Sequence, residues 1–315
     1  MALLELRDVM VEYRRRGRKP VMAVAGVSLT VEEGQIFGLV GETGCGKSTL
    51  ARAAVGLQPL SAGSIWFEGR QLVAMSRRGR SRYATRLQLV FQNPFSSLNP
   101  RRKVGRQVAD SVEILNLRPP GQRRSRVLEV MEEVGMSAGA ADRYPHQFSG
   151  GQRQRIAIAR ALAAEPSAIV MDEPLSALDV SAQAQIANLL LKLSSTLHVG
   201  LLLISHDLAI VRQIADSVAV MYLGLIVESA PAEDIWTAPL HPYTQALIKS
   251  IPRVDGYGSL PEALSGEIPD PANPPTGCRF HPRCPHAFDR CKKEVPPLVD
   301  VGHNRKAACW LVPAQ

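Results

Sequence analysis

Residues 41–49 read Gly-Glu-Thr-Gly-Cys-Gly-Lys-Ser-Thr and match the pattern G-x-x-x-x-G-K-[ST]. An apolar run precedes them and a helix-like stretch follows, which is the strand–turn–helix context of a phosphate-binding loop. The glycines let backbone N–H groups converge on phosphate oxygens, and the helix N-terminus adds partial positive charge. We expect Lys47 to reach the β- and γ-phosphates and the Ser48 hydroxyl to bind Mg²⁺. The predicted nucleotide contacts are Gly41, Gly44, Cys45, Gly46, Lys47, Ser48 and Thr49.

A pair of carboxylates follows another short apolar run. Residues 168–171 are typical of a buried parallel strand, and Asp172 and Glu173 come directly after them. Ligands of open α/β sheets lie beyond the carboxyl ends of the strands. We therefore expect Asp172 to hold Mg²⁺, directly or through water, and Glu173 to polarise an attacking water as a general base. A simple helix cap is the alternative for such a pair, and the phosphate-binding loop in the same chain favours catalysis.

A histidine marks the end of a third apolar run. His206 follows residues 200–204 and is expected at the same edge of the sheet as Glu173. A neutral imidazole there can hydrogen-bond the γ-phosphate or orient the water. The alternative is a structural strand-end histidine, and the predicted neighbour Glu173 favours the catalytic role.

A second anion site is predicted at residues 148–152, which read Phe-Ser-Gly-Gly-Gln and precede a long helix at 153–163. Ser149 can cap this helix, and the exposed backbone N–H groups beyond it can bind phosphate. One nucleotide does not need two such helix starts. We therefore expect a dimer in which each nucleotide lies between the loop of one subunit and this motif of the other. The predicted contacts are Ser149, Gly150, Gly151 and Gln152.

The elements that must position these residues alternate between strands and helices. The expected strands are residues 3–13, 27–32, 64–68, 168–171, 200–204, 218–223 and 225–228, and the expected helices are residues 104–117, 126–134 and 181–197. This alternation predicts an α/β domain with a largely parallel sheet. From residue 231 the chain is rich in proline and has little periodicity, which predicts a separate, small, loop-rich C-terminal region.

Composition narrows the classes of protein. The chain has 315 residues, of which 45% are hydrophobic, and no run approaches the roughly 18 apolar residues of a membrane span. The N-terminus lacks the features of a signal peptide, so a cytosolic protein is expected. The net charge is +8, and many of the basic residues lie in four clusters, at residues 14–19, 77–82, 101–106 and 123–126. Such clusters can bind nucleic acid or anionic lipid, or they can lie on solvated faces. Aromatic residues are only 5% and do not interleave with these clusters, so we expect no nucleic-acid partner.

Four of the five cysteines lie in the C-terminal region. Five, six and seventeen residues separate Cys278, Cys284, Cys291 and Cys309. Clustered thiols in a cytosolic chain rarely form disulfides, so an iron–sulfur cluster or zinc is expected, with free thiols as the alternative. His281 and His286 can substitute as ligands. Cys45 is a small residue inside the phosphate-binding loop and predicts sensitivity to thiol reagents.

The order of these motifs resembles that of ABC transporter ATP-binding subunits over residues 3–230. The resemblance rests on residues 41–49, on Gln92 within Val-Phe-Gln, and on residues 149–153, 169–173 and 206. It implies a phosphate-loop ATPase core, residues 1–230, with an antiparallel β subdomain and a helical subdomain at about 93–160 that transmits closure to permeases. It also implies that Tyr13 stacks on adenine, that Gln92 contacts Mg²⁺ and water, and that residues 176–179 couple the two sites. Phe148 departs from the usual leucine.

Residues 91–100, residues 241–247 and the cysteine region are similar to the oligopeptide/dipeptide importer subfamily. This resemblance implies a second ATPase, two transmembrane permeases, an extracytoplasmic substrate-binding protein and a place at the cytoplasmic face of the inner membrane. It also implies a [4Fe–4S] cluster, with zinc as the alternative, in a C-terminal region at 231–315. Peptide is the expected substrate, and nickel, glutathione and sugars are alternatives. A soluble ABC-type ATPase acting on DNA or ribosomes is less favoured, because residues 49–149 leave no room for a long coiled coil and the chain carries one ATPase domain.

Overall fold

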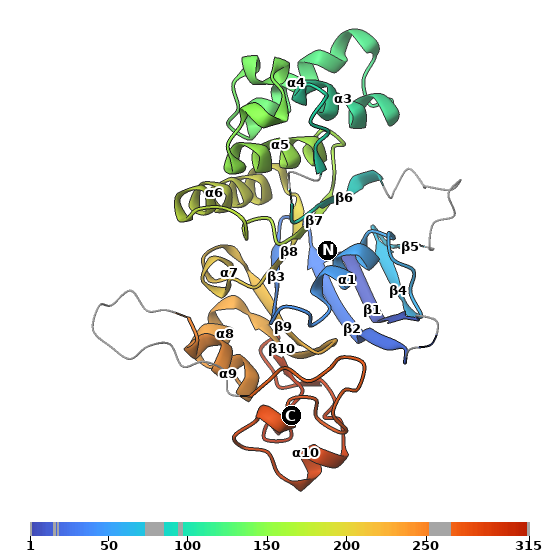
Figure 1. Ribbon diagram of the computed structural model, residues 1–315, viewed down its shortest axis with the longest axis vertical. Coiled ribbons are helices and arrows are strands. Elements are labelled where there is room, and N and C mark those ends of the chain that lie inside the picture. The colour runs from blue at the N-terminus through green and yellow to red at the C-terminus, as the bar shows by residue number, and fades with distance from the viewer. Residues whose placement is uncertain are drawn as a thin grey trace, which may run out of the picture.

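The computed structural model describes residues 2–14, 17, 19–72, 85–93, 97–251 and 266–313, and the described strands form two sheets (Figure 1). The larger sheet has the spatial order β11 (Val299–Asp300), β12 (Lys306–Ala307), β10 (Leu225–Pro231), β9 (Ser217–Tyr222), β3 (Ile36–Val40), β8 (Gly200–Ser205), β7 (Ala168–Asp172) and β6 (Leu87–Val90). The smaller sheet is antiparallel, in the order β2 (Val21–Glu32), β1 (Ala2–Tyr13), β4 (Ala62–Phe67) and β5 (Arg70–Leu72).

Helices surround the sheets. The described α-helices are α1 (Lys47–Ala54), α3 (Val104–Ile114), α4 (Arg123–Glu133), α5 (Gly150–Leu162), α6 (Val180–Leu197), α7 (Leu208–Ile214), α8 (Ala232–Thr237), α9 (Pro242–Lys249) and α10 (Asp289–Lys293). Short 3₁₀ helices are η2 (Pro120–Gln122), η3 (Ala138–Asp142), η4 (Pro145–Gln147) and η5 (His281–Arg283). The expected α/β fold with antiparallel and helical parts is confirmed.

The parallel strands of the larger sheet are buried on both faces. Every residue of β3, β7 and β8 is buried, as expected for strands covered on both sides. Alternation along β3 directs Phe37 and Leu39 into the core shared with α1 and the smaller sheet, and Ile36 and Val40 into the core shared with the helices. Because β3, β7 and β8 are parallel, their carboxyl ends meet at one edge, where the predicted chemistry lies.

The helices α3, α4 and α5 lie together at the end of the molecule opposite the C-terminus (Figure 1). Val108, Val130 and Ile156, one from each helix, are fully buried in the same core. Strands β1, β2 and β4 lie to one side, with α1 packed between them and the larger sheet (Figure 1). The helices and the antiparallel sheet therefore flank the strand ends from different directions.

The C-terminal region is not structurally separate from the core. Strands β11 and β12 extend the larger sheet, because β12 pairs with β10. Tyr222 of β9 packs against Tyr243 of α9 and Phe280, with ring centroids 4.6 Å and 5.3 Å away. A buried aromatic cluster thus joins residues of this region to the sheet.

Several elements differ from the sequence prediction. Strand β6 and the helices α7, α8 and α9 were not predicted, and β2 begins at Val21 rather than at residue 27. Strand β6 and the three helices are short, so they carry no long periodic pattern in the sequence. The basic cluster at 77–82 and part of the motif at 91–100 lie outside the described residues.

Candidate active site at the carboxyl edge of the sheet

The loop between β3 and α1 forms a compact turn. The φ angle of Gly46 is 109°, and a Cβ atom there would lie 2.2 Å from the carbonyl oxygen of Ala23. A side chain is therefore excluded both by conformation and by space. Lys47 follows at the start of α1 with only 4% of its surface exposed, and its Nζ donates to the carbonyls of Gly41 at 2.7 Å and Glu42 at 2.9 Å. The ammonium group is thus held inside the loop.

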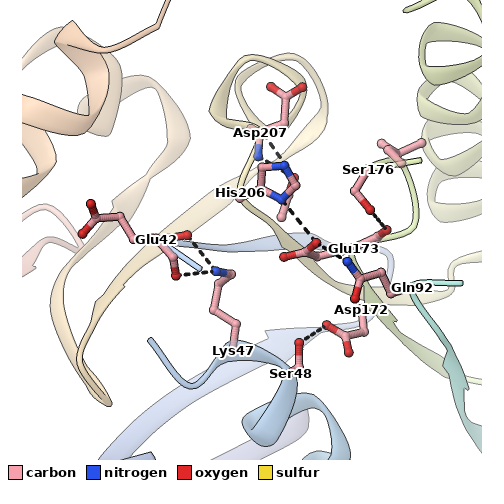
Figure 2. A network of polar contacts seen from close by, with 12 residues as sticks. Glu42, Lys47, Ser48, Gln92, Asp172, Glu173, Ser176, His206 and Asp207 are labelled. Atoms are coloured by element: carbon pink, nitrogen blue, oxygen red, sulfur yellow. Dashed lines mark hydrogen bonds and ion pairs between the residues drawn. The ribbon is translucent and has the colours of Figure 1, made fainter. Parts of the chain in front are cut away.

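Ser48 and Asp172 meet across the strand edge, as Figure 2 shows. The Ser48 Oγ donates to the Asp172 Oδ1 at 2.8 Å. Asp172 is 3% exposed, and burial raises the pKa of its carboxyl, with the Ser48 hydrogen bond acting in the opposite direction. A hydroxyl and a carboxylate that face each other offer the oxygen ligands that Mg²⁺ prefers.

Glu173 lies at the centre of a second polar group (Figure 2). Its Oε2 accepts from Gln92 Nε2 at 2.7 Å and lies 3.2 Å from His206 Nδ1. Its φ angle is 48°, a left-handed conformation that is uncommon for residues other than glycine, and its backbone N–H donates to Ile204 at 2.9 Å. Strand β8 therefore holds Glu173 in a strained conformation that places its carboxylate between two predicted partners.

The alternative of a helix cap for the acidic pair is excluded. Asp179 caps α6 by accepting from the backbone N–H of Ala182 at 2.8 Å. Asp207, next to His206, caps α7 in the same way. Asp172 and Glu173 precede these caps and face the loop instead.

One open pocket of about 530 Å³ collects most of these residues. The phosphate loop, Tyr13, Gln92, Glu173 and His206 line it together. The Tyr13 Oη lies 3.3 Å from the Thr49 Oγ1. The pocket also includes residues without a sequence signal of their own: Val21, Met22, Ala23, Leu223 and Pro271. The position of strand β2 and the β9–β10 turn at the pocket was not predicted from the sequence, because it depends on how the two sheets pack.

The second predicted anion site lies on a different element. Ser149 caps α5 by accepting from the Gln152 N–H at 3.3 Å, and Gln152 Oε1 accepts from the Ser149 N–H at 3.1 Å, which is a capping box. Ser149, Gly150, Gly151 and Gln152 are absent from the described lining of the loop pocket. Within one chain, the structure therefore does not bring the two anion sites together.

Cys45 is buried in the loop, 3.8 Å from the Lys47 Nζ. Burial raises the pKa of its thiol, although Lys47 acts in the opposite direction. A raised pKa disfavours the reactive thiolate. The structure thus argues against the predicted sensitivity of this residue to thiol reagents.

The four C-terminal cysteines are all free thiols, and they line one small cavity with His281 and His286. Burial raises the pKa of Cys278 to about 11, so its thiol is protonated at neutral pH. Among the residues that the structure describes, no group of three or more His, Cys, Asp or Glu side chains is placed to hold a metal ion. As placed, the thiols do not fit a metal centre, although they face the same cavity.

Comparisons with known proteins agree with this geometry. The family model of the ABC transporter matches residues 24–176, and that of the oligopeptide/dipeptide transporter, C-terminal region, matches residues 227–291. The di/tripeptide transport ATP-binding protein DppF of Pseudomonas aeruginosa is 45% identical over 313 residues, which cover 98% of this chain and 97% of the relative. This chain belongs to the oligopeptide/dipeptide family of ABC transporter ATP-binding proteins.

Other members and more distant structures extend the comparison. The oligopeptide transport ATP-binding protein AppF of Bacillus subtilis is 44% identical over 319 residues, which cover 98% of this chain and 97% of AppF. The dimeric post-hydrolysis structure of the ATP-binding cassette MJ0796, bound to ADP and Pi, superposes with a TM-score of 0.65 at 26% identity, over 73% of this chain and 98% of the cassette. The ABC ATP-binding protein described here is therefore an ATPase. None of its described helices is both long and apolar enough to cross a membrane.

Proposed function

We propose that this ATPase powers the import of di- and oligopeptides through a membrane transporter. The observation that carries the proposal is the C-terminal match to oligopeptide/dipeptide transporters at residues 227–291, in a chain whose nucleotide pocket is assembled at the sheet edge. Full-length relatives named as di/tripeptide and oligopeptide transport proteins support peptide as the substrate class. Nickel, glutathione or a sugar is the alternative cargo.

The residues at the site have two different roles. Lys47, Ser48 and Asp172 hold the phosphates and Mg²⁺, because an ammonium, a hydroxyl and a carboxylate meet at the start of α1. ATP replaces the carbonyl partners of Lys47 with charged phosphate oxygens, which are stronger acceptors. Tyr13 offers its ring to the adenine from the neighbouring sheet.

Glu173 is the general base for the attacking water. Gln92 and His206 both contact its Oε2, so they fix the carboxylate and direct Oε1 toward the water. Gln92 also serves as a contact to Mg²⁺ and reports the state of the transporter. The strained backbone of Glu173 keeps this orientation before the nucleotide arrives.

A second ATPase subunit completes the site. The N-terminus of α5, with Ser149 and two glycines, offers phosphate-binding N–H groups outside the pocket of its own chain. The dimer of the structural neighbour bound to ADP and Pi supports a sandwich of this kind. ATP binding closes the dimer, hydrolysis reopens it, and α3–α5 transmit the motion to two permeases at the cytoplasmic face of the inner membrane. An extracytoplasmic substrate-binding protein delivers the peptide, and the partner ATPase is an identical or a related chain.

Metal binding by the four cysteines remains a second, independent proposal, with a [4Fe–4S] cluster first and zinc as the alternative. Their shared cavity and the absence of disulfides among them support it, whereas their positions as described do not form a metal site. No step of hydrolysis depends on it. The test is to purify wild type and Cys278→Ser without oxygen and to measure iron, zinc and acid-labile sulfide per chain. A wild-type protein that holds less than about 0.1 equivalent of iron, zinc and sulfide per chain, the level of a contaminant, contradicts metal binding.

Uptake in the native cells tests peptide import. Cells that lack the gene are complemented with wild type or with Glu173→Gln and supplied with labelled dipeptides, oligopeptides, nickel, glutathione or a sugar. Peptide uptake restored by wild type and not by Glu173→Gln supports the proposal. Restored uptake of one of the other solutes, with peptide uptake unchanged throughout, contradicts it.

A further inference from the structure

The phosphate-binding loop and the C-terminal region are joined at Glu42. The guanidinium of Arg283 donates to Glu42 through two bonds, from Nη1 to Oε2 at 2.7 Å and from Nη2 to Oε1 at 3.0 Å. This is the two-pronged geometry that makes arginine–carboxylate pairs strong and specific in direction. The hydroxyl of Tyr243 accepts from the backbone N–H of Glu42 at 3.0 Å. The C-terminal region thus holds both the side chain and the main chain of one loop residue.

This pair is shielded from solvent. The side chain of Arg283 is 3% exposed, and that of Glu42 is 19% exposed. A buried pair gains little net stability, but removal of one partner leaves an uncompensated charge and strongly disfavours the geometry. The contact therefore specifies the shape of the loop more than it adds to the stability of the fold.

The position of Arg283 is set by the cysteine-lined segment, residues 278–291. The N–H of Arg283 donates to Phe280 at 3.0 Å, and Phe280 is buried in the aromatic cluster with Tyr222 and Tyr243. The N–H of Cys278 donates to Cys291 at 2.8 Å, which closes the segment. Arg283 directly precedes Cys284, so its backbone is continuous with the segment that lines the cysteine cavity.

Glu42 also contacts the lysine of the loop, since its carbonyl accepts from the Lys47 Nζ at 2.9 Å. Lys47 must leave this carbonyl when phosphate binds, and the carbonyl must stay in place for the loop to keep its shape. We propose that Arg283 is a positioning residue for ATP binding, which holds Glu42 and makes the nucleotide site sensitive to the packing of residues 278–291. The proposal concerns the ATPase itself and does not depend on the cargo.

Nucleotide affinity and steady-state kinetics of the purified full-length protein test the first part. Arg283→Met is expected to raise the Kd for a fluorescent ATP analogue, and the KM for ATP, by about tenfold, with kcat within about twofold. Arg283→Lys restores part of the affinity, because it keeps the charge but loses the second bond. The double variant Glu42→Gln/Arg283→Met is expected to bind ATP no more weakly than Arg283→Met alone. A wild-type Kd in Arg283→Met overturns the proposal, and so does an equal loss in kcat and affinity.

Two further variants separate positioning from folding. Lys306→Met is the matched control, because Lys306 lies in the C-terminal region at an exposed position of β12, outside residues 278–291. Its Kd stays at the wild-type value. Tyr243→Phe removes only the acceptor for the Glu42 N–H and raises the Kd by about threefold, even if Arg283→Met fails to fold. A wild-type Kd in Tyr243→Phe, or a raised Kd in Lys306→Met, counts against the proposal.

A thermodynamic cycle tests the link to the cysteines. Cys284→Ser is expected to raise the Kd for ATP by a few-fold in the wild-type background and to have no further effect in Arg283→Met. An equal change in both backgrounds shows that the cysteine acts by another route. No change in either background also contradicts the link.

Discussion

The sheet edge and the C-terminal region reach the same nucleotide by different means. At the sheet edge, fully buried parallel strands end together and deliver Glu173 and His206 to one pocket and Asp172 to the Ser48 hydroxyl beside it. The C-terminal region has little regular structure and contacts the loop through the pair of Arg283 and Glu42 and through a hydroxyl from Tyr243. Backbone topology thus brings the reactive side chains together, and we propose that a few long-range side-chain contacts adjust the affinity of the loop for nucleotide.

The largest effect is expected at the centre of the sheet edge. Glu173→Gln should lower the kcat of ATP hydrolysis by about 10³-fold and leave the Kd for ATP within a few-fold, because only the general base is lost. The measurement is single-turnover hydrolysis beside equilibrium binding. Asp207→Asn is a matched control, since Asp207 caps α7 and does not contact Glu173 in the described structure. Retained hydrolysis in Glu173→Gln removes Glu173 as the base.

Lys47→Ala should weaken ATP binding rather than the hydrolytic step. The buried ammonium is the main cation of the loop, so its loss is expected to raise the Kd for ATP by about 10- to 100-fold. Lys192→Ala, on an exposed position of α6, is the control. Affinity that is unchanged in Lys47→Ala, by calorimetric titration, contradicts the assignment of the loop.

Asp172→Asn is expected to raise the Mg²⁺ concentration for half-maximal hydrolysis by about tenfold, because a charged ligand becomes a neutral amide. The raised pKa of Asp172 means that the folded protein binds this proton more tightly than the unfolded chain. Stability without nucleotide therefore falls as pH rises from 3.8 through the raised value, and Asp172→Asn removes that loss. Chemical denaturation at several pH values measures it. A less stable variant at neutral pH contradicts this account.

The last effect lies in the C-terminal region and concerns stability rather than activity. Burial lowers the pKa of His241 from 6.5 to about 3, and its Nδ1 accepts from the Tyr243 N–H. Its contribution to stability is therefore present above pH 6.5 and is lost as pH falls toward 3. Each pH unit in that window removes up to about 1.4 kcal/mol from the free energy of unfolding. His241→Asn keeps a cap for α9 and should lack this slope. Equal slopes in the two proteins contradict the prediction.

The residues at the sheet edge could be predicted from the sequence because each of them belongs to a local sequence pattern. The loop has a fixed spacing, and Asp172 and His206 come directly after apolar runs whose strand ends share an edge. Glu42, Tyr243 and Arg283 carry no such pattern, since Glu42 and Arg283 are 241 positions apart and meet only after the aromatic cluster has packed. Strands β11 and β12 are two residues long and were beyond any periodicity.

We propose that this ATPase works in a membrane transporter together with a second ATPase subunit. The most direct test is gentle detergent purification of the tagged protein from its native cells, followed by identification of every co-purifying chain. We predict two multi-span permeases and either a second ATPase or two copies of this chain. Ribosomal or DNA-repair partners without a membrane protein would contradict the account.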